Sequence, residues 1–179
     1  MIPFIDLAAQ QGRIRPKIDA NLAKVLDHGG YIMGPEVLAI EARLAEYAGV
    51  KHCISCSSGT DALILALLAL GLKPGQGVIV PSFTFAASAE VMPVLGAIPV
   101  FAEVDASSFN LDPAKLGDAL QTARAQDIDV VGIIGVGLFG QPADYHAIAA
   151  FARDEGLWVI DDAAQSFGAS RNSTRVGQL

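Results

Sequence analysis

Short apolar runs alternate with longer stretches of helical periodicity along most of the chain. Runs typical of strands occupy 51–55, 77–81, 98–101, 130–135 and 157–161, and helical stretches lie between them near 60–70, 86–95, 113–125 and 144–155. The order strand, helix, strand predicts an α/β fold in which a mostly parallel sheet is covered by helices on both faces. Apolar spacing over 14–26 and a proline at position 35 predict two more helices before the first strand.

The composition limits the classes of partner. The chain has 179 residues, of which 52% are hydrophobic and 17% charged, so we expect much of it to be buried or to lie in an interface. A net charge of −7 and a pI near 4.8 argue against a nucleic acid or an anionic membrane as partner. The longest apolar run, 62–72, is too short to cross a bilayer, and the first residues do not resemble a signal peptide, so we expect a cytoplasmic protein.

The most informative single stretch is LWVIDDAAQ at 157–165, an apolar run that ends on two carboxylates. It predicts a buried parallel strand that brings Asp161 and Asp162 to its carboxyl end, where open α/β sheets bind ligands. Neighbouring residues on an extended chain point to opposite faces, so we expect only one of the two acids to reach a given ligand. Gln165 follows closely enough to contact the same ligand.

A carboxylate at a strand end has two interpretations. It can cap the following helix or accept hydrogen bonds from loop N–H groups, which is a structural role. It can also pair with the protonated pyridine nitrogen of pyridoxal 5′-phosphate (PLP), which keeps that ring an effective electron sink. The second interpretation requires a phosphate site, a group that stacks on the ring and a lysine for the Schiff base.

The chain offers candidates for the first two requirements. The stretch SSGT at 57–60 leads from the first predicted strand into an apolar helix, and free N–H groups at a helix start, with the Thr60 hydroxyl, can bind phosphate. A simple helix cap by Ser58 or Thr60 explains the same residues. Phe83 or Phe85, after the second predicted strand, can stack on an aromatic ring, and an ordinary core phenylalanine is the alternative.

Two other motifs point to different ligands. GVGLFG at 135–140 matches the dinucleotide fingerprint, with an acid about 20 residues further on, which would make the protein an oxidoreductase. Pro142 argues against it, because it would fall inside the helix that this fingerprint requires. Cys53 and Cys56 have the spacing of half a zinc site, but the other ligands are missing and a strand would separate the two side chains. We expect both to be buried thiols.

Several motifs together resemble the DegT/StrS family of sugar aminotransferases. The resemblance covers nearly the whole chain in the family's order, and it is carried by GYIMGPE at 30–36, SSGTDAL at 57–63, PSFTF at 81–85, LFGQPAD at 138–144 and DDAAQ at 161–165. It implies the large domain of a type I PLP-dependent transferase, followed in the family by a small C-terminal domain. Residues 1–50 would then form a helical segment that packs on the large domain.

The resemblance also implies roles for individual residues. Gly59 and Thr60 would hold the cofactor phosphate, Phe85 would stack on the ring, Asp162 would pair with the pyridine nitrogen, and Gln165 would contact the side of the ring that carries the hydroxyl. The family acts as homodimers whose two active sites contain residues of both chains. Its usual substrates are nucleotide-linked keto sugars, aminated with glutamate as donor for amino sugars and cell-surface polysaccharides.

The catalytic lysine of the family has no counterpart in this sequence. In the family it follows the Asp-x-x-Gln motif beyond a segment such as 174–179, so we expect it after Leu179, in a longer enzyme that also supplies the last strands of the sheet. We expect the lysines that are present to be solvated surface residues, namely Lys17, Lys24, Lys51, Lys73 and Lys115.

Two alternatives use the same scaffold. In a sugar dehydratase that depends on pyridoxamine phosphate (PMP), a histidine replaces the lysine. A non-catalytic relative would keep the fold without the chemistry, and the presence of both Thr60 and Asp162 argues against it.

Overall fold

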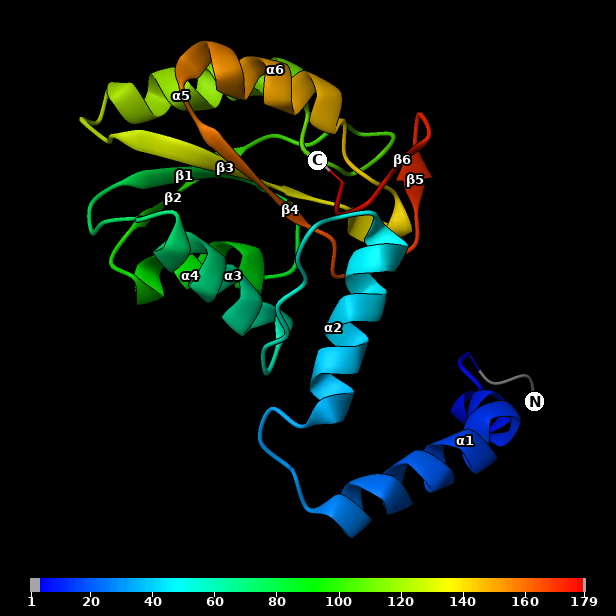
Figure 1. The fold of residues 1–179 in the computed structure, drawn as a ribbon. Coiled ribbons are helices and arrows are strands. Elements are labelled where there is room, and N and C mark those ends of the chain that lie inside the picture. The colour runs from blue at the N-terminus through cyan, green and yellow to red at the C-terminus, as the bar shows by residue number, and fades with distance from the viewer. Residues whose placement is uncertain (1–3, 179) are drawn as a thin grey trace. The chain divides into compact units, whose positions relative to one another are not determined.

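The computed structural model describes residues 4–178, which form two compact units that divide between Leu44 and Ala45 (Figure 1). The first unit contains α1 (Leu7–His28) and the start of α2 (Pro35–Ala48), the two helices predicted before the first strand. The side chain of Asp6 caps α1 by accepting a hydrogen bond of 2.9 Å from the backbone N–H of Ala9. None of the residues of α1 is buried. That residues 1–50 pack on the large domain therefore stays a prediction, and residues 1–3 lie outside the described chain.

Four strands of the second unit form one parallel sheet, as predicted. Their order across the sheet is β2, β1, β3, β4, and all three neighbouring pairs are parallel. Each strand lies within one residue of its predicted bounds. The strands are β1 (Gly77–Pro81), β2 (Ile98–Ala102), β3 (Val130–Val136) and β4 (Trp158–Asp162).

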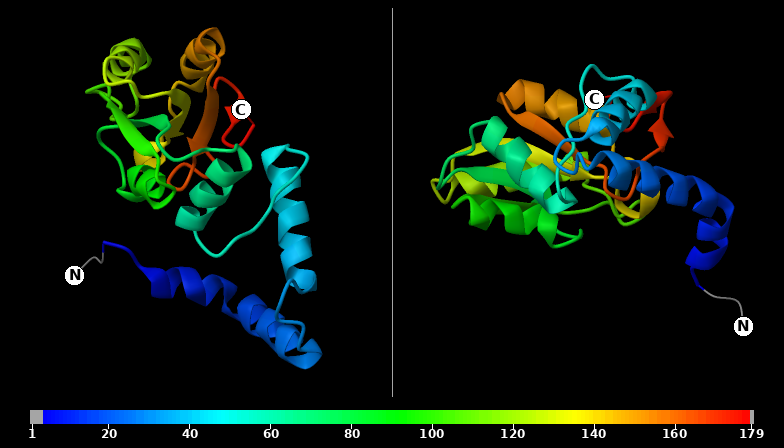
Figure 2. Two further views of the ribbon diagram at one scale, coloured as in Figure 1. Left: turned by 90° about the vertical axis from the view of Figure 1, so that its left-hand side faces the viewer. Right: turned by 60° about the horizontal axis from the view of Figure 1, so that its bottom comes forward.

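Helices cover both faces of this sheet, which makes a three-layer sandwich (Figures 1 and 2). The pair α5 and α6 lies on one face, and the pair α3 and α4 lies on the other. A short 3₁₀ turn, Pro113–Lys115, leads into α5, and a second, Leu138–Gly140, follows β3. The four helices are α3 (Gly59–Ala69), α4 (Ala87–Val94), α5 (Leu116–Arg124) and α6 (Tyr145–Glu155).

Alternate residues of each central strand enter different layers of the core. Ile79 and Ile133 pack with side chains of α5 and α6, whereas Val80 and Ile134 pack with side chains of α3 and α4. All four are fully buried. Burial on both faces explains why the strands read as continuous apolar runs in the sequence. Each such side chain contributes about 1.5–3 kcal/mol to folding.

A small antiparallel hairpin, β5 (Ser170–Arg171) and β6 (Thr174–Arg175), follows the sheet. Its turn residues Asn172 and Ser173 both have a positive φ, as the tight turns that join antiparallel strands require. Among the described helices, none is both long and apolar enough to span a bilayer.

The predicted strand at 51–55 is wrong. These residues are not in a strand, and of residues 51–60 only Cys53 is partly buried. A strand needs a neighbouring strand for its backbone hydrogen bonds, and among residues 4–178 this run belongs to neither of the two sheets. The buried thiols are wrong for the same reason, because Cys53 is half-buried and Cys56 is exposed. No cluster of metal-ligating side chains occurs in the described part of the chain.

Candidate functional site

The carboxyl ends of the four strands meet at one edge of the sheet, because all the strands are parallel. Three of the five predicted cofactor-binding residues belong to this edge: Asp162 ends β4, Gln165 follows it, and Phe85 follows β1. In open α/β sheets this edge is where ligands bind.

Asp161 and Asp162 point to opposite faces of β4, as predicted. Oδ2 of Asp162 accepts a hydrogen bond of 2.8 Å from the hydroxyl of Ser88 on α4. Oδ1 of Asp161 accepts one of 2.5 Å from the hydroxyl of Tyr145 on α6. Since α4 and α6 cover different faces of the sheet, the two acids serve different environments.

The carboxylate of Asp162 is held through both of its oxygens. Besides Ser88, the backbone N–H of Ala164 lies 3.3 Å from Oδ1. Ser88 is fully buried, and its hydroxyl is 3.3 Å from Oγ1 of Thr84 in the segment after β1. Asp162 itself is only partly buried, so the carboxylate is oriented without being enclosed.

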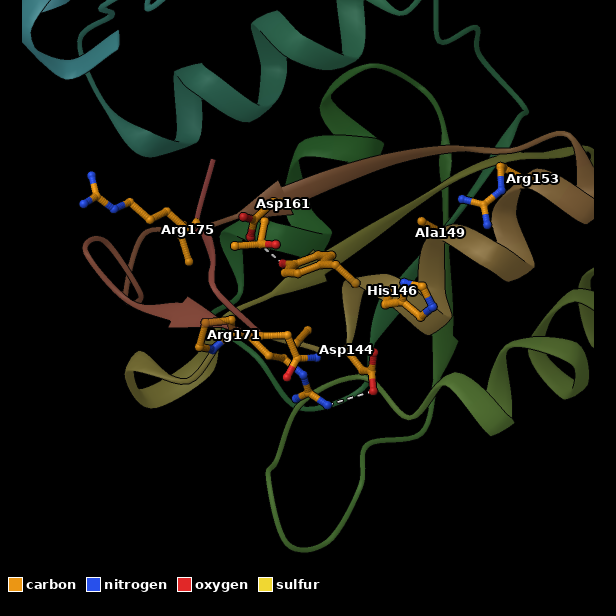
Figure 3. Close-up of a pocket in the computed structure, with 13 residues that line it drawn as sticks. Asp144, His146, Ala149, Arg153, Asp161, Arg171 and Arg175 are labelled. Atoms are coloured by element: carbon orange, nitrogen blue, oxygen red, sulfur yellow. Dashed lines mark hydrogen bonds and ion pairs between the residues drawn. The ribbon is translucent and has the colours of Figure 1, made fainter. Parts of the chain in front are cut away.

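Asp161 faces a pocket of about 390 Å³ between α6 and the hairpin (Figure 3). Burial raises the pKa of Asp161 above its ordinary value, while the Tyr145 hydroxyl and the backbone N–H of Gly177 act in the opposite direction. Burial, followed by the charge of Asp161, also raises the pKa of Tyr145. An ion pair of 2.7 Å between Arg171 and Asp144 joins the hairpin to the start of α6 at the rim of this pocket.

Gln165 is tied to the segment that follows β3. Its Oε1 accepts a hydrogen bond of 2.8 Å from the backbone N–H of Phe139. Asn110, which is buried, fixes the same segment, because its side chain accepts from the N–H of Leu138 at 3.0 Å and donates to the carbonyl of Gln141 at 2.8 Å. The stretch 135–140 is thus the end of a strand and a 3₁₀ turn, and α6 begins only at Tyr145. This geometry agrees with the argument against a dinucleotide fingerprint.

The two candidate stacking residues behave differently. The ring of Phe83 packs with those of Phe109 and Phe139, at centroid distances of 5.8 and 6.3 Å. The side chain of Phe85 is 68% exposed and makes no ring contact within residues 4–178. Of the two, Phe85 has the free ring face that stacking on a cofactor requires.

The start of α3 has the properties of a phosphate cradle. Ser58 caps the helix by accepting from the N–H of Asp61 at 3.1 Å, and no described residue accepts from the N–H groups of Gly59 and Thr60. A Cβ added at Gly59 would meet no other atom within 4 Å, so the space in front of this helix end is open. Hydrogen bonds from the hydroxyls of Ser57 and Ser58 lower the pKa of Asp61.

The structure connects some of the predicted residues and leaves others apart. Asp162 and Phe85 are linked through Ser88, because the N–H of Ser88 donates to the carbonyl of Phe85 at 3.1 Å. No backbone hydrogen bond joins Gly59 or Thr60 to the other predicted site residues within the described chain.

Ser88 and Asn110 are not among the residues predicted from the sequence. Ser88 gave no signal in the sequence, because its partner lies 74 residues away. Asn110 lies in a polar stretch whose composition is typical of a surface loop, yet its side chain is buried.

Comparison with known proteins matches residues 13–179 to the DegT/DnrJ/EryC1/StrS aminotransferase family. The chain belongs to this family. Membership confirms the resemblance seen in the sequence and the predicted type I fold. The remote alternative of a dinucleotide-binding oxidoreductase is not favoured.

Relatives in this family are close over the whole chain. The UDP-2-acetamido-2-deoxy-3-oxo-D-glucuronate aminotransferase of Pseudomonas aeruginosa is 52% identical over 179 residues, which are 100% of this chain and 48% of that protein. A DegT DnrJ EryC1 StrS aminotransferase from Brucella abortus has a solved structure with a TM-score of 0.95 and 46% identity, covering 99% of this chain and 48% of that one.

The structure of DesV from S. venezuelae, in complex with a ketimine intermediate, matches with a TM-score of 0.92 and 39% identity, covering 98% of this chain and 46% of that one. This chain therefore spans about half the length of the relatives that it matches.

Proposed function

We propose that the complete protein is a PLP-dependent aminotransferase that moves an amino group from an amino-acid donor, glutamate, to a nucleotide-linked keto sugar. The observation that carries this proposal is the carboxylate of Asp162. It lies at the carboxyl end of β4, a parallel strand at the edge of the sheet, and is oriented through both of its oxygens by Ser88 and by the N–H of Ala164. Such a group can keep a pyridine nitrogen protonated.

The residues of this chain fit the cofactor. The N–H groups of Gly59 and Thr60, with the Thr60 hydroxyl, would bind its phosphate at the start of α3, where donors and space are both available. Phe85 would cover one face of the ring, and Asp162 would pair with the ring nitrogen. Gln165, held by the backbone of Phe139, would contact the hydroxyl side of the ring.

The cofactor supplies the electron sink that amino transfer requires, and these residues hold it in place. Asp162 would hold a proton on the ring nitrogen of the bound cofactor. The lysine that moves the proton at the donor carbon is expected in the sequence after Leu179.

The substrate class follows from the relatives. The Pseudomonas aeruginosa relative is named for a nucleotide-linked 3-keto sugar acid, and its identity of 52% to this chain supports a substrate of the same class. We also propose that the complete protein is a cytoplasmic homodimer with shared active sites, which supplies amino sugars for cell-surface polysaccharides. The PMP-dependent dehydratase and the non-catalytic relative are not favoured by the named relatives.

The test is a coupled assay on the complete protein. With PLP, glutamate and UDP-2-acetamido-2-deoxy-3-oxo-D-glucuronate, we expect 2-oxoglutarate and the aminated sugar nucleotide in equal amounts, measured by mass spectrometry. Loss of water from a sugar nucleotide without net amino transfer would instead show a dehydratase. A protein that binds PLP but forms no 2-oxoglutarate from glutamate, with or without the sugar, would contradict glutamate as donor.

A further inference from the structure

We propose that Ser88 is a positioning residue for the reaction, which acts by fixing the carboxylate of Asp162 toward the ring nitrogen of the cofactor. This inference rests on the proposed function and adds a residue to it. It starts from the hydrogen bond of 2.8 Å between Oγ of Ser88 and Oδ2 of Asp162.

The direction of this hydrogen bond is fixed by chemistry. An ionised carboxylate only accepts hydrogen bonds, so the Ser88 hydroxyl must be the donor. The hydroxyl has one proton, and at its other neighbour, Oγ1 of Thr84 at 3.3 Å, it can then only accept. The order of donation is therefore Thr84 to Ser88 to Asp162, and it fixes the position of Oδ2 of Asp162.

A local structural role explains Ser88 poorly. A serine inside a helix commonly bonds to a carbonyl of the preceding turn, or caps the helix start. Here the hydroxyl leaves α4 and reaches an acid on β4, 74 positions further along the chain. Ser88 is fully buried, so its hydroxyl is shielded from water, whereas Asp162 is partly buried.

The segment 85–88 carries two parts of the proposed site, the ring of Phe85 and the hydroxyl of Ser88. The backbone N–H of Ser88 donates to the carbonyl of Phe85 at 3.1 Å, so the stacking residue and the residue that orients the acid lie on one turn. A displacement of this turn would therefore move both the Phe85 ring and the hydroxyl that orients Asp162. This is the arrangement that a cofactor held between a stacking ring and a carboxylate requires.

The experiment measures cofactor binding by the complete protein rather than its turnover. The variants are Ser88→Ala, Asp162→Asn and the double variant, each prepared without cofactor and titrated with PLP. Two quantities are followed: the PLP dissociation constant, and the pH dependence of the bound cofactor's absorbance. We expect Ser88→Ala to weaken PLP binding roughly tenfold, since a hydrogen bond to a charged group is lost. The absorbance change that reports loss of the proton on the ring nitrogen should move to lower pH, because that proton is held less firmly.

The double variant separates a positioning role from a purely structural one. If Ser88 acts through Asp162, Ser88→Ala should change PLP affinity less than about twofold in the Asp162→Asn background. An equal loss in both backgrounds, or an unchanged affinity and pH profile in Ser88→Ala, would overturn the inference. If Asp162→Asn itself left both quantities unchanged, the proposed function would fail instead.

Two further variants complete the experiment, one as a substitute test and one as a control. Thr84→Val removes the donor to Ser88 and keeps the side-chain size, so we expect a smaller change in the same direction. It serves as the test if Ser88→Ala does not fold, and an unchanged pH profile would then overturn the inference. Thr122→Ala on α5 removes a helix hydroxyl that bonds to the carbonyl of Asp118, on the other face of the sheet, and should leave PLP affinity unchanged.

Discussion

The hydroxyl of Tyr145 donates a hydrogen bond of 2.5 Å to Oδ1 of Asp161, on the face of β4 opposite to Asp162. This contact lies in a buried setting, and the other oxygen of Asp161 makes no well-formed hydrogen bond to the described residues. The two carboxylates are neighbours in the sequence, but they therefore have different roles. Asp161 contacts Tyr145 of α6, and Asp162 contacts Ser88 of α4 and is the acid proposed to pair with the cofactor.

Removing the partner of Asp161 should destabilise the protein. Tyr145→Phe leaves a buried carboxylate oxygen without its donor, so we expect the free energy of unfolding at pH 7 to fall by about 1–3 kcal/mol. Chemical denaturation of the complete protein measures this. In the Asp161→Ala background the same substitution should cost less than about 1 kcal/mol, and an equal cost in both backgrounds would show that the hydroxyl acts elsewhere.

The raised pKa of Asp161 should also appear in the pH dependence of the free energy of unfolding. Burial raises its pKa above the ordinary value of 3.8, so between that value and the folded-state pKa the folded protein binds more protons than the unfolded chain. Ionised Asp161 therefore lowers stability as the pH rises through this window. We expect Asp161→Asn to match the wild type near pH 4 and to gain unfolding free energy relative to it toward pH 7. A relative loss at neutral pH would contradict the raised pKa.

The Asn variants of the two acids should differ most in their rate of amino transfer. Asp162→Asn in the complete enzyme removes the group that keeps the ring nitrogen protonated, so we expect amino transfer to slow by orders of magnitude while PLP still binds through its phosphate. Asp161→Asn is the matched control and should retain most of the rate. Single-turnover measurements with glutamate give both values. A near wild-type rate for Asp162→Asn would move the assignment to Asp161.

The start of α3 gives a separate prediction about affinity. Thr60→Ala removes a hydroxyl donor to the phosphate, so PLP affinity should fall by roughly tenfold or more, because a hydrogen bond to a charged group contributes about 1.5–3 kcal/mol. Saturation with the sugar substrate should change little. Thr60→Ser, which keeps the hydroxyl, is the control. Equal PLP affinity for wild type and Thr60→Ala in a titration would remove Thr60 from the site.

Much of the fold was predictable because it depends on local patterns. The four strands of the sheet are buried on both faces and appear as apolar runs, and the alternation of an extended chain sends Asp161 and Asp162 to opposite faces. Helix ends were also local, as Gly29 shows by ending α1 in a left-handed conformation with φ 65°.

What failed depends on contacts between distant parts of the chain. The run 51–55 has strand-like composition, but a strand exists only where a neighbouring strand pairs with it. Ser88 and Asn110 are polar residues whose burial is offset by partners far along the chain, and their sequence neighbours do not reveal those partners. Periodicity describes which side of an element is buried, and it carries no information about which polar groups meet across elements.

The last prediction concerns residues 1–179 expressed alone. In the type I fold the strand that leads into the phosphate cradle joins the rest of the sheet through two strands that follow the catalytic lysine. Within residues 4–178 the run 51–55 is not in a strand, and β4 ends the sheet on one side with each of its residues only partly buried. The backbone groups of that edge have no strand partner in the described chain, and the helix start that carries Gly59 and Thr60 follows a segment that is not in a strand.

We therefore expect residues 1–179 alone to aggregate or to stay partly disordered, and to show no absorbance from lysine-bound PLP. Size-exclusion chromatography, thermal unfolding and a PLP titration test this, with the complete protein as the control. Exposed apolar side chains on α3, such as Leu65 and Leu68, which are 52% and 53% exposed, would favour self-association of such a fragment. A soluble fragment that unfolds cooperatively and binds one PLP through a lysine would contradict the prediction, and it would require one of the five lysines present to be catalytic.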